Sequence, residues 1–135
     1  MGRSSTPGGY GAAIYDPSMA DLTLWHNQRC SKSRGAHEIL EEAGVAFDEK
    51  RYLDDPPTAA ELDSVLTALG MEPWELARMG EDVAKELSLK DLEHDRQRWI
   101  EVMVANPILI ERPILVTKNG RAVVGRPPEA VRALL

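Results

Sequence analysis

Cys30 is the only cysteine in the chain, and its neighbours are more typical of a reactive thiol than of a buried one. It lies in the segment HNQRCSKSR, residues 26–34, where polar and cationic side chains stand in place of the apolar neighbours of a core cysteine. Nearby cations lower the pKa of a thiol from its free value of about 8.5 and favour the thiolate, which is the nucleophilic form. The segment therefore predicts an activated nucleophile, with inert packing of a small side chain as the alternative.

A thiol without a partner limits the redox chemistry of the chain. In Cys30-Ser31-Lys32-Ser33, a serine stands where a dithiol oxidoreductase has its second cysteine. No intramolecular disulfide can form, so any redox cycle needs an external thiol. Because the chain has no disulfide and its start does not resemble a signal peptide, we expect it to work in the reducing cytoplasm.

The elements that must position Cys30 are a strand predicted over residues 21–26 and a helix predicted from Ser31 to about residue 43, before Gly44. Cys30 lies where the strand passes into the helix. The unpaired N–H groups and the positive end of the helix dipole should therefore lie near its sulfur, and both favour the thiolate.

The remaining elements follow from hydrophobic periodicity and turn signals. Residues 45–53 alternate as a strand does, and a short strand-helix-strand connection makes the two strands parallel. Helices are predicted from the capping box Thr58–Glu61 to Gly70, and then over 73–79, 81–87 and 89–105. Asn119-Gly120 between ILVT and RAVV predicts a hairpin, and Pro127-Pro128 opens a last helix. This order predicts an α/β, thioredoxin-like fold, a four-stranded mixed sheet with flanking helices and an inserted helical block.

Composition and charge exclude several classes of protein. The 135 residues suit one domain, which we expect over 19–135, whereas the Gly-, Ser- and Pro-rich residues 1–18 predict a disordered tail or an expression leader. The net charge of −6 argues against nucleic acid as a partner, and no apolar run approaches the roughly 20 residues that span a membrane. Without a metal-ligand cluster or a Gly-rich phosphate loop in the sequence, we expect no metal and no bound cofactor.

Three separated motifs resemble those of the glutaredoxin-linked arsenate reductase family, the ArsC-like group, and especially its short members. They are HNQRCSKSR at residues 26–34, NPILIERPILV at 106–116 and GRPPE at 125–129. The resemblance runs from about residue 21 to residue 135. It implies the thioredoxin-like fold with a helical insertion, in agreement with the predicted element order.

The resemblance also implies a role for particular residues. Cys30 matches the nucleophile of the family, and His26 matches a histidine that favours the thiolate. Three arginines match those that surround the oxyanion, and these are Arg78, Arg112 and Arg126. Guanidinium groups bind tetrahedral oxyanions bidentately and neutralise a charge that otherwise repels the thiolate. Ser33 and Arg34 are further candidates for substrate binding. By analogy with thioredoxin-like folds, Pro113 is predicted to follow a cis peptide bond beside the cysteine.

The activity that the resemblance implies is reduction of arsenate to arsenite through a covalent adduct on Cys30. Glutathione is then the co-substrate, glutaredoxin the resolving partner, and the protein is expected to be a monomer. Two alternatives stay open. One is a glutathione-dependent thiol-disulfide oxidoreductase, although three anion-binding arginines exceed what a disulfide requires. The other is a regulator of the Spx type that binds RNA polymerase, but such regulators carry a Cys-x-x-Cys pair, which this chain lacks.

Overall fold

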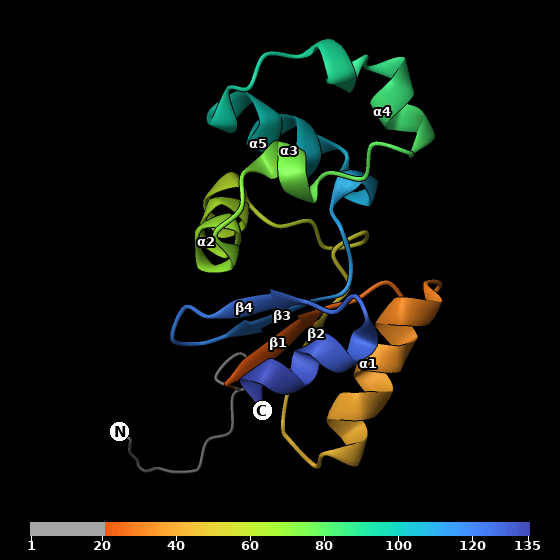
Figure 1. Ribbon diagram of the computed structural model, residues 1–135, viewed down its shortest axis with the longest axis vertical. Coiled ribbons are helices and arrows are strands. Elements are labelled where there is room, and N and C mark those ends of the chain that lie inside the picture. Colours follow the sequence, from red (N-terminus) through yellow and green to blue (C-terminus); the bar gives the residue numbers. More distant parts are fainter. Residues whose placement is uncertain (1–20) are drawn as a thin grey trace.

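The computed structural model of the protein describes residues 21–135, which form a four-stranded mixed sheet between two layers of helices (Figure 1). The predicted tail, residues 1–18, and the domain boundary at residue 19 lie outside this range. The strands are β1 (Leu22–Trp25), β2 (Asp48–Lys50), β3 (Ile114–Thr117) and β4 (Ala122–Val124). Their order is β2-β1-β3-β4, with β1 parallel to β2 and antiparallel to β3, and β3 antiparallel to β4. The predicted α/β fold is confirmed.

Each face of the sheet has its own helical layer. One face is covered by α1 (Ser31–Glu42) and by the 3-10 helix η4 (Pro128–Leu134), which pack against each other (Figure 1). The other face carries the inserted block, which consists of α2 (Ala59–Leu69), α3 (Pro73–Leu76), α4 (Asp82–Glu86), η2 (Leu89–Asp91), α5 (Arg96–Ala105) and η3 (Pro107–Leu109). Among the helices of residues 21–135, none has the length and apolar content needed to cross a membrane.

The strands contribute to two hydrophobic clusters because successive side chains point to opposite faces of a sheet. Leu24 and Leu115 pack in the cluster under α1 and η4, whereas Trp25 and Ile114 pack in the cluster under the helical block. The register pairs Leu24 with Leu115 and Trp25 with Ile114. The two clusters are therefore built on neighbouring rows of the same two strands.

Several predicted elements are shorter in the structure. The helix expected over 73–79 ends at Leu76, because Ala77 is extended and pairs with Ile110 in an isolated β-bridge. The strand expected over 45–53 pairs with β1 only over Asp48–Lys50, because the chain turns back after Arg51, whose carbonyl accepts from the N–H of Asp54 at 3.0 Å. The helix expected over 89–105 is divided into η2 and α5. A new start is made at Asp95, whose carboxylate caps α5 by accepting from the N–H of Arg98. The predicted final helix is present as the 3-10 helix η4.

Candidate active site

Cys30 is the N-cap residue of α1, in extended conformation at the point where the chain leaves the sheet. Its side chain is half-buried. Burial raises the pKa of the thiol, but the backbone N–H groups of Ser33 and Lys32 and the guanidinium of Arg112 lower it, and the net result is a pKa below the ordinary value. The structure therefore places Cys30 where the sequence predicts it, at the start of a helix whose N–H groups favour the thiolate.

Two of the predicted arginines lie against Cys30, although they come from segments far along the chain. Nη2 of Arg126 is 3.7 Å from Sγ of Cys30, and Nε of Arg126 donates to the carbonyl of Arg112 at 2.8 Å. Arg112 precedes β3 and Arg126 follows β4, so the antiparallel pairing of these strands brings both arginines to one end of the sheet. The peptide bond before Pro113 is cis, as predicted, and the bond before Pro127 is cis as well.

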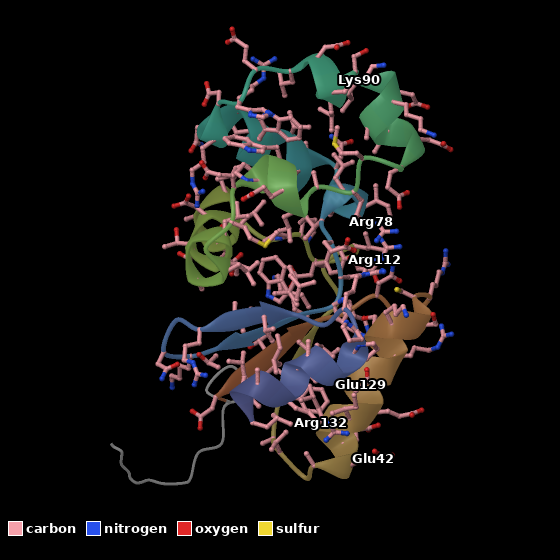
Figure 2. The ribbon with its side chains drawn as sticks, viewed as in Figure 1. Glu42, Arg78, Lys90, Arg112, Glu129 and Arg132 are labelled. Atoms are coloured by element: carbon pink, nitrogen blue, oxygen red, sulfur yellow. The ribbon has the colours of Figure 1, made fainter. Side chains whose placement is uncertain are left out.

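Arg112 holds unused hydrogen-bond donors inside the site. Its side chain is only 11% exposed. Nevertheless, Nε and Nη1 are buried and have no hydrogen-bond partner among the residues of the described chain. Buried donors are almost always paired, and a pair left open beside a thiolate is suited to an anion that binds there. Figure 2 shows Arg112 at the same edge of the molecule as Arg78.

Two carboxylates, which the sequence analysis did not identify, hold these arginines together. Oε1 of Glu111 accepts from Nη1 of Arg78 at 2.6 Å and from the backbone N–H of Arg112 at 3.1 Å, and it lies 3.0 Å from Nε of Arg126. Oε2 of Glu81 accepts from Nε of Arg78 at 3.1 Å and lies 3.8 Å from Nη1 of Arg112. Arg78 is therefore joined to the cysteine site through Glu111.

His26 and Ser33 form a buried pair behind the cysteine. Nδ1 of His26 lies 2.7 Å from Oγ of Ser33, which also accepts from the backbone N–H of Asn27 at 2.9 Å. Burial lowers the pKa of His26 below 6.5, although Glu49, 3.7 Å from Nε2, opposes the shift. His26 thus meets Cys30 through Ser33, whose backbone N–H contacts Sγ. The hydroxyl of Ser33 is turned inward, and substrate binding by Ser33 stays a prediction.

Arg34, the remaining candidate, is exposed and lies on the outer side of the loop. Its Nη1 donates to the carbonyl of Gln28 at 3.0 Å. This contact closes the turn that precedes Cys30, so the observed partner of Arg34 is the loop backbone. Its role in substrate binding also stays a prediction.

Tyr52 is a buried polar residue near the arginines that the sequence analysis did not select. Its hydroxyl donates to the carbonyl of Ile110 at 3.5 Å. Burial raises the pKa of the phenol to about 12, although the charges of Arg112 and Arg78 act in the opposite direction. Tyr52 is therefore a neutral hydroxyl next to the arginine cluster.

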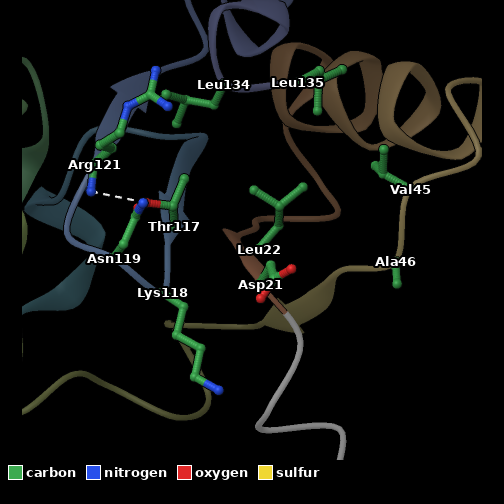
Figure 3. Close-up of a pocket in the computed structure, with 10 residues that line it drawn as sticks. All are labelled: Asp21, Leu22, Val45, Ala46, Thr117, Lys118, Asn119, Arg121, Leu134 and Leu135. Carbon is green, nitrogen blue, oxygen red and sulfur yellow. Dashed lines mark hydrogen bonds between the residues drawn. The ribbon is translucent and has the colours of Figure 1, made fainter.

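A hollow of the described chain lies away from Cys30. A pocket of about 670 Å³ opens where β1 begins and the β3–β4 hairpin turns, between Leu22, Thr117 and Leu135 (Figure 3). Cys30 follows the other end of β1, so this pocket lies at the opposite end of the sheet. Cys30 lies instead beside the charged side chains of Arg112 and Arg126.

The sheet topology, the cis-proline and the half-exposed N-cap cysteine define a thioredoxin-like protein with a single cysteine beside two arginines. The model of the ArsC family matches residues 25–134. The chain belongs to the ArsC family, and the resemblance found in its motifs is confirmed.

Three similar proteins illustrate this membership. YfgD of Escherichia coli, an uncharacterized protein, is 48% identical over 111 residues, which are 82% of this chain and 92% of that protein. An arsenate reductase of Neisseria meningitidis is 40% identical over 118 residues, 87% of this chain and 100% of that protein. The solved structure of an arsenate reductase from Vibrio cholerae is 38% identical, with a TM-score of 0.81, and the match covers 86% of this chain and 98% of that chain.

Proposed function

We propose that the protein reduces arsenate to arsenite, with Cys30 as the nucleophile and glutathione as the reductant. The observation that carries the proposal is the position of the thiol. Sγ of Cys30 lies 3.7 Å from a guanidinium nitrogen of Arg126, and the open donors of Arg112 belong to the same site. Arsenate is a tetrahedral oxyanion, and such donors neutralise its charge as the thiolate approaches. Relatives named arsenate reductases add support.

The first step forms a bond between sulfur and arsenic. The thiolate of Cys30 attacks arsenic(V) of H₂AsO₄⁻, one As–O bond breaks, and a proton joins the departing oxygen so that it leaves as water. The product is a thioester of arsenate on Cys30, still arsenic(V). Arg126 and Arg112 stabilise the negative charge on the remaining oxygens throughout this step.

The second step transfers two electrons to arsenic. The thiol of glutathione attacks Sγ of Cys30, a disulfide forms between the two sulfurs, and arsenic leaves with the electron pair of the S–As bond as H₂AsO₃⁻. Because this chain has no second cysteine, a further thiol must release Cys30. In the proposal this is done by glutaredoxin with glutathione, in a reducing compartment such as the cytoplasm.

Substitution of Cys30 by serine tests the nucleophile. We expect Cys30→Ser to lower arsenate reduction by at least about a thousandfold, because a serine hydroxyl is not ionised near neutral pH and forms no disulfide. The measurement is arsenate-dependent NADPH oxidation in a system of glutathione, glutathione reductase and glutaredoxin, with circular dichroism to establish that the variant is folded. Activity equal to that of the wild type in the folded serine variant would disprove the role of Cys30.

The thiol-disulfide oxidoreductase alternative uses the same cysteine and differs in its substrate. Comparison of kcat/KM for arsenate with kcat/KM for a glutathionylated peptide distinguishes the two. We expect arsenate to be preferred, because Arg112 and Arg126 lie at the sulfur of Cys30, where arsenate brings a negative charge and a disulfide bond does not. Preference for the peptide would support the alternative.

A further inference from the structure

The anion site contains negative charge as well as positive charge. The three guanidiniums of Arg78, Arg112 and Arg126 carry three positive charges, and Glu81 and Glu111 carry two negative charges against them. The thiolate of Cys30 brings the sum of the formal charges to zero. An arginine cluster alone would attract the most highly charged anion, whereas this site is balanced before any substrate enters.

The carboxylates do not occupy every hydrogen-bond donor of the arginines. Glu111 holds Nε of Arg126 and Nη1 of Arg78. The donor of Arg126 that faces the sulfur is Nη2, and Nε and Nη1 of Arg112 are without hydrogen-bond partners in the part of the chain that is described. On Arg126, the nitrogen that faces the sulfur is thus not the one that lies against Glu111, whereas Nη1 of Arg112 lies 3.8 Å from Oε2 of Glu81 without a hydrogen bond to it. A bound oxyanion at Nη2 of Arg126 and the carboxylate of Glu111 at Nε then contact the same guanidinium.

We propose that Glu111, assisted by Glu81, makes the site selective for the charge of a tetrahedral oxyanion. The site binds a protonated oxyanion with a single negative charge more tightly than an oxyanion that remains a dianion at neutral pH. Specificity is a difference of affinities, and a repulsive group raises it by weakening the binding of the competitor. Glu111 and Glu81 repel a dianion about twice as strongly as a monoanion. The site is partly buried, so water screens this repulsion poorly. Arsenate and phosphate take up a proton near neutral pH, whereas sulfate does not. The proposal rests on the proposed function for the natural substrate, but anion selection itself requires no turnover.

Protection of Cys30 against alkylation tests the selection directly. The wild-type protein and Glu111→Gln are treated with iodoacetamide at pH 7 and constant ionic strength, with inorganic phosphate or inorganic sulfate added, and Cys30 alkylation is followed by mass spectrometry. Gln keeps the acceptor oxygen and removes the charge. We expect phosphate to protect the wild type at much lower concentration than sulfate, and the ratio of the two half-protecting concentrations to fall about tenfold in Glu111→Gln.

Two further variants sharpen the result. Glu81→Gln is also expected to lower the ratio of the half-protecting concentration of sulfate to that of phosphate. Glu129→Gln makes the same change of charge on η4, at an exposed carboxylate just past Arg126, and is expected to leave the ratio unchanged (Figure 2). If the ratio of half-protecting concentrations is unchanged in both Glu111→Gln and Glu81→Gln, the proposal is overturned. This holds even if both anions bind more weakly to the variants, because the carboxylates then only position the arginines.

The experiment separates this proposal from the proposed function. If the ratio changes as expected but the wild type does not reduce arsenate, the selection stands and the proposed reaction is disproved. If arsenate is reduced while the ratio is the same in all variants, the reaction stands and the selection is disproved. If neither anion protects the wild type, the anion site assumed by both proposals is disproved.

Discussion

Arg112 is the side chain that, together with the backbone N–H groups of Ser33 and Lys32, lowers the pKa of Cys30. It contributes both a hydrogen bond and a positive charge to the lowering of the Cys30 pKa. Its guanidinium is nearly buried, so water screens this charge less than it screens the charge of an exposed arginine. The same side chain keeps two donors open for an anion. In the proposed reaction, Arg112 therefore favours the thiolate of Cys30 and also binds the anion that the thiolate attacks.

Replacement of Arg112 by methionine should make the thiol less reactive at neutral pH. Without the cation, the pKa of Cys30 rises, less thiolate is present at pH 7, and alkylation by iodoacetamide slows by about tenfold. In a rate-pH profile, the midpoint moves to higher pH. Arg132→Met, which removes an exposed arginine of η4, is the matched control and should keep the wild-type profile (Figure 2). Identical profiles for Arg112→Met and the wild type would contradict this role.

The residue types of the candidate site could be predicted from the sequence, but most of the contacts between them could not. Cys30 has a local signature, and the motifs pointed to Arg112, Arg126 and the cis bond before Pro113. Glu81 and Glu111 were missed because carboxylates beside arginines in a sequence are usually solvated. Their partners are distant in part: Glu111 meets Arg78 from 33 positions away. The local signals are the position of Glu111 next to Arg112 and the position of Glu81 three residues after Arg78.

At the scale of elements, the junction between β4 and η4 supports the active site from behind. The N–H of Gly125 donates to the carbonyl of Pro113 at 2.8 Å. A Cβ on Gly125 would lie 2.7 Å from Cγ of Pro113 and 3.1 Å from Cγ1 of Val131. The chain on either side of this contact carries Arg112 and Arg126. Glycine at this position thus allows the close approach that places both arginines.

Substitution Gly125→Ala should both destabilise the protein and impair its activity. The added methyl group forces Pro113 or the junction to move, which we expect to cost about 1–3 kcal/mol in the free energy of unfolding, measured by urea denaturation. The KM for arsenate should rise because the arginines move with the backbone. For stability, Gly80→Ala is the matched control, since a Cβ there meets nothing within 4 Å. A variant as stable as the wild type would show that the contact relaxes without cost.

The elements themselves were predictable where local signals agreed. Thr58 and Glu61 form the capping box expected at the start of α2, and Gly70 ends it in left-handed conformation. The break between η2 and α5 was missed because the apolar stripe continues through it. The indole N–H of Trp99 donates to the carbonyl of Glu93 at 2.8 Å and holds the intervening segment out of the helix, a contact that periodicity does not reveal.

At the scale of the whole molecule, one small sheet joins two hydrophobic clusters. Leu40 of α1 and Met103 of α5 are fully buried on opposite faces of it. Along β1 and β3, successive residues belong alternately to the two clusters: Leu24 and Leu115 to one, Trp25 and Ile114 to the other. Loss of packing on one face therefore removes support from strands that the other face needs, and the described chain should unfold as a unit.

Amide hydrogen exchange should reveal this single unit. We expect the amides of Leu40 and Met103 to exchange with the same free energy of opening, equal to the global free energy of unfolding from urea denaturation. In the Gly80→Ala variant, the free energies of opening at Leu40 and Met103 should likewise equal the global free energy of unfolding. A markedly lower value at Met103 than at Leu40 would mean that the helical block opens separately from the sheet and α1.

The contacts of Glu81 and Glu111 have a consequence for the entropy of binding. A free arginine side chain has many rotamers, and fixing one costs up to about 2 kcal/mol. Here the rotamers of Arg78 and Arg126 are restricted by carboxylates of the chain itself. Their conformational entropy is lost when the chain folds, before a substrate arrives. An incoming oxyanion meets guanidiniums that are already oriented, so its binding free energy is not reduced by the ordering of flexible side chains.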